Sequence, residues 1–318
     1  MLAAADKDAA ALYEPAVQAL AGNALAALRS QRLAALLERI GGSTSRYATA
    51  GAAPTELTAF PPLTGAELAA EVDAHPPFGR LQLQREPFIR AGLATAALPR
   101  PAPIAWTRAD LDAEARWGAR ALRRVGLDRR MRSSDCLDGG LVTPGTLAIS
   151  DALDALDALA LPVGPVTTEA ALRRAAEVWE IVRPRVLNVD APSLTFLYAA
   201  PGYPRPDAFA VLLVPADAAA LAGEAQPDIY RILSVPQVGT FAAGECSAHD
   251  GYHLIEDGIA AEIVDTQGAA LPDGSDGRLL LTTLTRSLAL LRFDTGLRAA
   301  LDRTPCGCGE THARLHFA

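Results

Sequence analysis

The spacing of apolar residues changes near residue 228, and this change constrains the fold more than any other feature of the sequence. Before it, helical spacing over 168–182 leads into the short apolar runs Arg185–Val189 and Phe209–Val214. Alternation of helices with short, fully apolar strands is typical of an α/β fold built on a parallel sheet. We therefore predict an α/β core over residues 79–227.

After residue 228 the helical spacing stops, and short β-like runs follow one another. Gly251, Gly268 and the turn Pro272–Gly274 separate these runs, as expected for a chain that reverses direction often. The sequence therefore predicts a β-rich region over 228–318. Its expected strands are Ile229–Val235, His253–Ile255, Ala261–Val264, Arg278–Thr283 and Leu290–Phe293.

The first 78 residues are expected to form a helical region. Leucines at helical spacing predict a helix over 8–40, which Gly41 and Gly42 end. Thr64 is a plausible N-cap for a second helix over 65–74, and His75 with the two prolines after it ends that helix.

Four further expectations fall inside the α/β core. Residues 81–90 are a strand candidate, and 91–103 are expected to be irregular because they hold three prolines. Thr107 should cap a helix over 108–125 with its arginines away from the apolar face. The repeated Asp-Ala-Leu triplets of Ser150–Leu161 are interpreted as an amphipathic surface helix.

Composition excludes several classes of protein. Half of the 318 residues are hydrophobic, which excludes a disordered chain. The formal net charge of −8 without any basic run argues against nucleic acid or an anionic membrane as a partner. No apolar stretch reaches the ~18–20 residues of a membrane span, and the acidic N-terminus does not resemble a signal peptide. Four cysteines in 318 residues favour a reducing, cytoplasmic location. Lys7 is the single lysine of the chain.

Cysteine and histidine gather at the C-terminal end of the chain. One segment holds Cys246 and His253, and a second holds Cys306 and Cys308 in a Cys-Gly-Cys-Gly turn. Two ligands from each segment would make a tetrahedral zinc site, and four protein ligands would make it structural rather than catalytic. The alternative is a set of unconnected surface residues. His249 or His312 could replace one of these four ligands.

Several motifs in this order resemble the phenylacetate–CoA ligase family of adenylate-forming enzymes. They are Phe60–Thr64, Trp106–Asp112, Gly251–Gly258, Ala261–Asp265, Leu271–Thr285, Leu291–Gly296 and Pro305–His312. The resemblance implies the α/β N-terminal domain of these enzymes, which binds ATP and an acyl substrate. A small lid domain with a catalytic lysine would normally follow. A Cys-x-Cys-Gly turn with an upstream Cys and His also recurs in the family, which supports zinc.

The chain departs from the family pattern wherever ATP chemistry is expected. The family's glycine-rich phosphate loop with its Lys-Pro end is replaced over 90–103 by a segment with one glycine, no lysine and three prolines. Val235 stands where an acid helps to hold magnesium, and Leu297 where an aspartate binds ribose. The sequence also stops at Ala318, where the lid would begin. We therefore expect a truncated relative that binds no ATP.

The resemblance places the acyl pocket near Ser133–Gly140. Cys136 could be a nucleophile for acyl transfer, although a lone cysteine is more often a small buried hydrophobe. Asp135 and Asp138 could position an amine or water, although acids before glycines usually form turns. The substrate-pocket candidates are Asp138, Gly139, Gly140 and Tyr230.

Three interpretations of function remain. The first is an enzyme of specialised metabolism that transfers an acyl group from acyl-CoA or an acyl-carrier protein to a carrier thiol or amine. Arg120, Arg123 and Arg124 could meet CoA phosphates, unless they form a solvated helix face. The second is a non-catalytic binding or partner-stabilising subunit, in a heteromer or a homodimer. The third is a CoA ligase that a separate lid protein completes.

Overall fold

A mixed sheet of eleven strands organises the protein. The computed structural model describes residues 12–20, 22–48, 54–83, 86–129, 131–139, 145–200, 208–213 and 229–317. The strands of the sheet are β3 (Arg132–Asp135), β4 (Leu159–Pro162), β5 (Val186–Val189), β6 (Ala208–Leu213), β7 (Ile229–Val235), β8 (Gly239–Gly244), β9 (Tyr252–Leu254), β10 (Ile259–Val264), β11 (Gly277–Thr283), β12 (Phe293–Asp302) and β13 (Arg314–Phe317).

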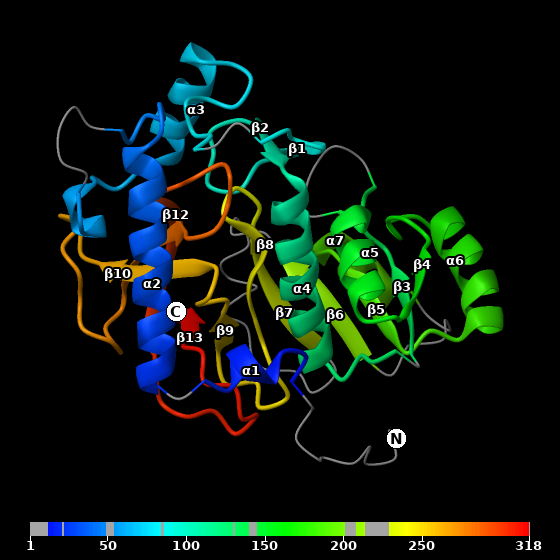
Figure 1. Ribbon diagram of the computed structural model, residues 1–318. Coiled ribbons are helices and arrows are strands. Elements are labelled where there is room, and N and C mark those ends of the chain that lie inside the picture. Colours follow the sequence, from blue (N-terminus) through cyan, green and yellow to red (C-terminus); the bar gives the residue numbers. More distant parts are fainter. Residues whose placement is uncertain are drawn as a thin grey trace.

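The sheet has a parallel half and an antiparallel half. Its order is β10-β11-β12-β13-β9-β8-β7-β6-β5-β3-β4. All pairs from β4 to β7 are parallel, and all pairs from β7 to β10 are antiparallel. Strand β7 belongs to both halves, so the expected α/β core and β-rich region share one continuous sheet (Figure 1). The predicted α/β fold class is confirmed.

Helices cover the sheet and were mostly foreseen. Thr64 and Thr107 cap α3 and α4 with complete capping boxes, which Glu67 and Asp110 close. Helix α2 lies over the antiparallel half and α4 over the centre (Figure 1). The helices are α1 (Pro15–Gln18), α2 (Gly22–Gly41), α3 (Gly65–Ala74), α4 (Arg108–Arg124), α5 (Thr146–Ala155), α6 (Glu169–Val182) and α7 (Ala191–Ala199), with a 3-10 turn at Leu57–Ala59.

The segment 81–106 differs from the prediction. Instead of a strand over 81–90 and an irregular stretch over 91–103, the chain forms the two-stranded antiparallel hairpin of β1 (Arg90–Ala94) and β2 (Ala102–Trp106). The prolines that suggested irregularity lie in the turn or at Pro103, which pairs with Leu93 on an isolated ribbon. Proline is tolerated there because such a strand has a free edge.

Other elements were missed or misplaced. The expected helix over Ser150–Leu161 ends at Ala155, and Leu159 begins edge strand β4, because its backbone pairs in parallel with Arg132. The strand expected at Leu290–Phe293 begins only at Phe293. Strands β3, β8 and β13 and helix α7 were not predicted. The sequence Arg-Ser-Ser-Asp of β3 is too polar to signal a buried strand.

Close packing fixes α4 against the sheet. A side chain at Gly118 would bring its Cβ within 2.5 Å of the Ala152 side chain and 2.7 Å of the Phe241 ring. A Cβ at Gly258 would lie 2.1 Å from the Trp117 indole. Only glycine therefore permits the approach of α4 to both α5 and β8.

Two arginines of α4 are buried rather than solvated. The expectation that they meet CoA phosphates or form a solvated helix face was therefore wrong for Arg120 and Arg124. Arg120 bonds both oxygens of Asp257, at 2.6 and 2.9 Å, and also Glu14. Arg124 bonds both oxygens of Glu310, at 2.6 and 2.8 Å. With these partners, neither residue remains available for CoA phosphates.

Within the described residues, no helix is long and apolar enough to cross a membrane.

Removing one partner of the Arg124–Glu310 pair should be costly, because Glu310 would be left buried and charged. We expect Arg124→Met to lower the free energy of unfolding by about 3–5 kcal/mol. The matched change Arg298→Met breaks an exposed pair with Asp276 and should cost less than about 1 kcal/mol. Urea unfolding of both variants measures the difference, and equal losses would contradict the role of the buried pair.

Candidate metal centre and substrate cleft

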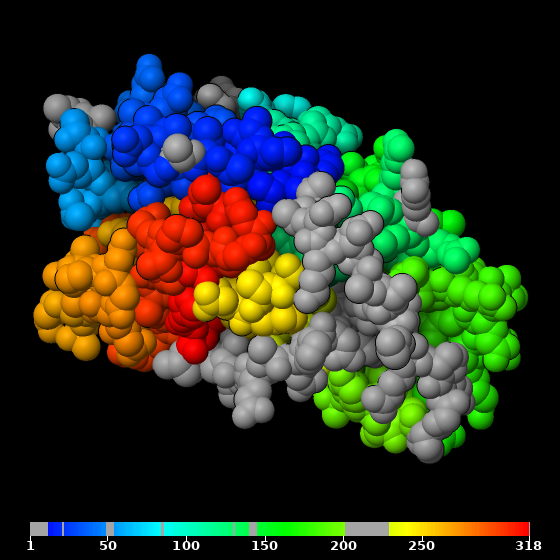
Figure 2. Space-filling view, turned by 90° about the horizontal axis from the view of Figure 1, so that it is seen from below, coloured from blue at the N-terminus to red at the C-terminus, as the bar shows by residue number. Residues whose placement is uncertain are grey.

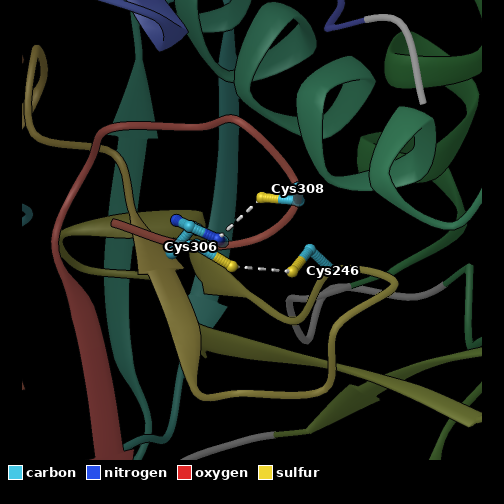
Figure 3. A group of neighbouring side chains, drawn as sticks. Cys246, Cys306 and Cys308 are labelled. Atoms are coloured by element: carbon cyan, nitrogen blue, oxygen red, sulfur yellow. Dashed lines mark hydrogen bonds between the residues drawn. The ribbon is translucent and has the colours of Figure 1, made fainter. Parts of the chain in front are cut away.

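The structure brings together the four residues predicted to bind metal. The ligand atoms of Cys246, His253, Cys306 and Cys308 all lie within 4.8 Å of one another. The sulfurs of Cys246 and Cys306 are 3.7 Å apart, and Cys308 Sγ lies 3.2 Å from His253 Nε2 (Figure 3). A tetrahedral zinc ion with Zn–S bonds of 2.3 Å would separate two sulfurs by about 3.8 Å. The donor set and the spacing therefore fit zinc.

Local backbone geometry explains how each ligand reaches this point. Cys246 follows the end of β8, and His253 lies in β9. The Cys306–Gly309 segment closes a tight turn, in which the Gly309 amide donates to the Cys306 carbonyl over 3.1 Å. Gly309 has φ +85°, a left-handed value that favours glycine. The turn directs both cysteine side chains toward the strand residues.

Hydrogen bonds within the cluster lower the pKa of the Cys306 and Cys308 thiols and so favour their thiolates, the form of cysteine that binds zinc. A hydrogen bond with Cys246 lowers the pKa of the Cys308 thiol and raises that of Cys246. Burial opposes the charged form of His253, but hydrogen bonds with Cys306 and Cys308 prevail and raise its pKa to about 9.

The two alternate histidines lie outside the cluster. The His249 ring stacks on Tyr230, with ring centres 4.7 Å apart. The His312 Nδ1 atom faces the Leu254 carbonyl at 2.9 Å, and its own carbonyl lies 3.1 Å from His253 Nδ1. That contact orients the imidazole of His253 with Nε2 toward the sulfurs, as outer partners of metal ligands commonly do.

The turn that carries Cys308 is anchored from the other end of the chain. Glu310 accepts hydrogen bonds from Arg124 and from the Gln18 amide, and Thr311 bonds the Gln18 carbonyl. Burial opposes ionisation of Glu310, but the positive charge of Arg124 prevails and lowers its pKa to about 2. Figure 2 shows the N-terminal helices, in blue, lying against the red C-terminal segment.

A separate cleft lies between the β1–β2 hairpin, α4 and α5. The space between its walls, counted together with the solvent at its open side, is about 530 Å³. Trp106, Leu111 and Leu147 give it apolar walls, and an ion pair between Arg90 and Asp151 stands beside them. Such a mixture of apolar walls and few polar groups is typical of small-molecule sites.

The predicted pocket residues are only partly in this cleft. Asp138 and Gly139 line it, whereas Gly140 lies outside the described residues. Tyr230 is not among the lining residues and stacks on His249 instead. Sequence reasoning missed Arg90 and Asp151, because nothing in their spacing indicates that the hairpin meets α5.

Cys136 is fully buried, as the alternative interpretation stated. Burial raises the pKa of its thiol, and the negative charge of Asp135 raises it further. It is therefore a poor candidate for a nucleophile. Burial also raises the pKa of Asp135 to about 6, and one of its oxygens has no partner among the described residues. Asp135 caps the turn to Leu137 through a 3.2 Å hydrogen bond.

Comparison with known proteins identifies the fold. No family model matches the chain. Phenylacetate-coenzyme A ligase of Thermus thermophilus is 28% identical over 324 aligned residues, which cover 96% of this chain and 72% of that protein. The chain is thus similar to a phenylacetate–CoA ligase. The predicted resemblance is confirmed.

Solved structures agree on the fold. A crystal structure of 2-hydroxyisobutyryl-CoA ligase with its acyl-AMP matches with a TM-score of 0.79 at 18% identity, covering 95% of this chain and 68% of that one. The same ligase with acyl-AMP and CoA matches with a TM-score of 0.76 at 17% identity, covering 95% and 69%. The phenylacetate–CoA-ligase-like chain therefore has the fold of an adenylate-forming CoA ligase.

The two residues that the sequence analysis expects in place of ATP-binding acids are buried. Val235 and Leu297 are buried in the hydrophobic core, 0% and 3% exposed. In the turn of the β1–β2 hairpin, Ala96 is 2% exposed and its carbonyl accepts from the Gln237 amide.

Buried Asp135 gives a prediction about pH. Its pKa of about 6 lies above the unfolded value of 3.8, so stability is lost as pH rises from about 4 to 6. Asp135→Asn keeps an oxygen that accepts from the Leu137 amide. It should raise the free energy of unfolding at pH 7 by up to roughly 3 kcal/mol. The gain should vanish below about pH 4, where the wild-type carboxyl is protonated in both states. Unfolding curves across this range test it, and a pH-independent difference would contradict it.

Proposed function

We propose that this ligase-like chain binds an acyl thioester in the cleft and does not make an acyl adenylate. The acyl donor would then be an activated thioester, on CoA or on a carrier protein. Acyl transfer to a carrier thiol or an amine is the reaction that fits such a ligand.

The packing of the hairpin turn is the observation that carries this proposal. A phosphate loop needs free backbone N–H groups and open space above them. Here the Ala96 carbonyl is held by Gln237, and a Cβ at Gly65 would lie 1.8 Å from the Ala97 carbonyl oxygen. The turn is therefore packed against the start of α3, which leaves little open space for a phosphate at this point.

The cleft supplies the features an acyl group requires. Trp106, Leu111 and Leu147 provide apolar contact for an acyl chain or ring, and Thr146 and Asp138 lie at the same wall. Because Arg90 is already paired with Asp151, a neutral acyl group fits better than a free carboxylate.

One observation favours a second candidate, a non-catalytic binding or partner-stabilising subunit. Cys136, the one cysteine near the cleft, is buried and poorly ionisable. Covalent acyl transfer through this residue would need exposure of its thiolate. Binding of a thioester without turnover would support this second candidate.

We also propose that Cys246, His253, Cys306 and Cys308 hold a structural zinc ion. The four donors complete a tetrahedral shell and leave no open position for a substrate. Zinc would fasten the β9 strand to the C-terminal turn, which Glu310 links to α4.

Purified protein should contain about one zinc ion per chain, because four donors converge on one point. Cys306→Ser should lose the metal, whereas the matched change Cys136→Ser should keep it. Chelation should lower the melting temperature, since the ion binds only the folded chain. Elemental analysis and thermal melts measure both. Metal content that is the same in the two serine variants would refute the site.

Mg–ATP should not bind, whereas phenylacetyl-CoA or benzoyl-CoA should raise the melting temperature above the level seen with CoA alone. Leu147→Glu should abolish this shift by placing a charge in the cleft. Ile181→Glu, at an exposed site away from the cleft, should leave the shift intact. Calorimetry and thermal shift measure these effects. Micromolar ATP affinity would instead support a ligase completed by a separate lid protein.

A further inference from the structure

A groove lies between helices α2 and α4, on the face of the sheet that both helices cover (Figure 1). The space between its walls, counted together with the solvent at its open side, is about 720 Å³. None of its eleven lining residues lines the substrate cleft, and eight of them are polar or charged. The charged ones are Arg32, Arg39, Glu86, Asp110, Arg116 and Asp257.

These charges are separated along the groove, because the two helices run in opposite directions (Figure 1). Arg39 near the end of α2 interacts electrostatically with Asp110 at the start of α4. Arg32 lies seven residues before Arg39, and Arg116 lies six residues after Asp110. Both spacings correspond to about 9–10 Å along a helix, so Arg32 and Arg116 lie together at the other end of the groove.

The end at the start of α4 is acidic. Asp110 and Glu86 both line it, and Arg39 interacts with the two carboxylates. The oxygens of Asp110 are occupied, because they accept hydrogen bonds from Thr107 and from the Ser287 amide. Glu86 is exposed, and its carboxylate has no hydrogen bond or ion pair among the described residues. One arginine and two carboxylates give this end a net charge of 1 − 2 = −1.

The opposite end is basic. Asp257 is neutralised there by Arg120, which bonds both of its oxygens and also Glu14. The Arg116 side chain is 48% exposed and lies 3.5 Å from Glu14, and Arg32 is exposed without a partner among the described residues. Three arginines and two carboxylates give this end a net charge of 3 − 2 = +1.

The wall between the two ends is apolar. Ala113 lies between Asp110 and Arg116 along α4, so its methyl group stands between the acidic end and the basic end. The Trp117 ring also lines the groove. The small alanine side chain leaves room for a chain of methylene groups, and contact of such a chain with apolar atoms is favourable.

We propose that this groove binds an extended zwitterion, a chain of methylene groups with a carboxylate at one end and an ammonium at the other, as in an ω-amino acid. The carboxylate would pair with Arg32 and Arg116, because the guanidinium fork suits a carboxylate. The ammonium would pair with Glu86. The site lies outside the acyl cleft, and the inference does not depend on the proposed function.

6-Aminohexanoate, hexanoate and hexylamine form a matched set for the test, because they share a chain length and differ in their charged ends. Saturation-transfer NMR with the full chain should detect 6-aminohexanoate at millimolar concentration. Hexanoate and hexylamine each lack one exposed ion pair and should bind at least about threefold more weakly. Added salt should weaken binding of the zwitterion, since it screens exposed charges. No binding of 6-aminohexanoate, or equal binding of all three compounds, would overturn the proposal.

Charge reversals at exposed residues locate the binding. Arg32→Glu makes both ends −1, so hexylamine should then bind more tightly than hexanoate. Glu86→Lys makes both ends +1 and should reverse that order. Each variant should weaken 6-aminohexanoate about threefold or more. The double variant exchanges the two end charges and should recover much of the affinity, because the ligand can bind in the reverse direction.

The matched controls are Arg173→Glu and Glu180→Lys, the same charge changes at exposed positions of α6. They should leave the affinities and the order of the two singly charged compounds unchanged. If the groove variants do not change that order, or the α6 controls change it equally, the ligand binds elsewhere and the proposal is overturned.

Discussion

The buried ion pairs of α4 hold the structure together. The side chains of Arg120 and Arg124 in the central helix bond partners that are distant in sequence. These partners are Asp257 after β9 and Glu310 in the C-terminal turn. Each charge is desolvated, so each must keep its partner. The pairs therefore fix where the β-rich end sits relative to the parallel half. Because Glu310 also bonds Gln18, they fix the N-terminal helix as well.

That arrangement determines what the candidate sites can be. The turn at Cys306–Gly309 is positioned by the Glu310 contacts as well as by its own glycines, which brings the four candidate metal ligands close together. On the opposite side, the β1–β2 hairpin separates two pockets of different character. Its turn is packed against the start of α3, and its two faces contact the candidate substrate cleft and a smaller apolar pocket.

Arg286 connects these regions. It lines the apolar pocket, pairs with Glu114 of α4 and stacks over Trp106, which lines the cleft. One buried guanidinium thus helps to shape both pockets. A single buried cation with five N–H donors can hold a helix, a hairpin and a loop in register, because its planar fork bonds in several directions at once.

The sequence by itself determined the α/β class, most helices with their threonine caps, and the four residues of the cysteine–histidine cluster. Periodicity, capping and cysteine spacing are local patterns, and they survive into the fold. Strand β3 and the β1–β2 hairpin were not predicted. Their polar or proline-containing residues form strands only through pairing with other segments, which the local pattern does not indicate. Only the tertiary structure decided that Arg120 and Arg124 are buried and that Asp151 meets Arg90. The sequence around a charged residue does not reveal its distant partner, because the same residue is solvated or paired according to what the fold places beside it.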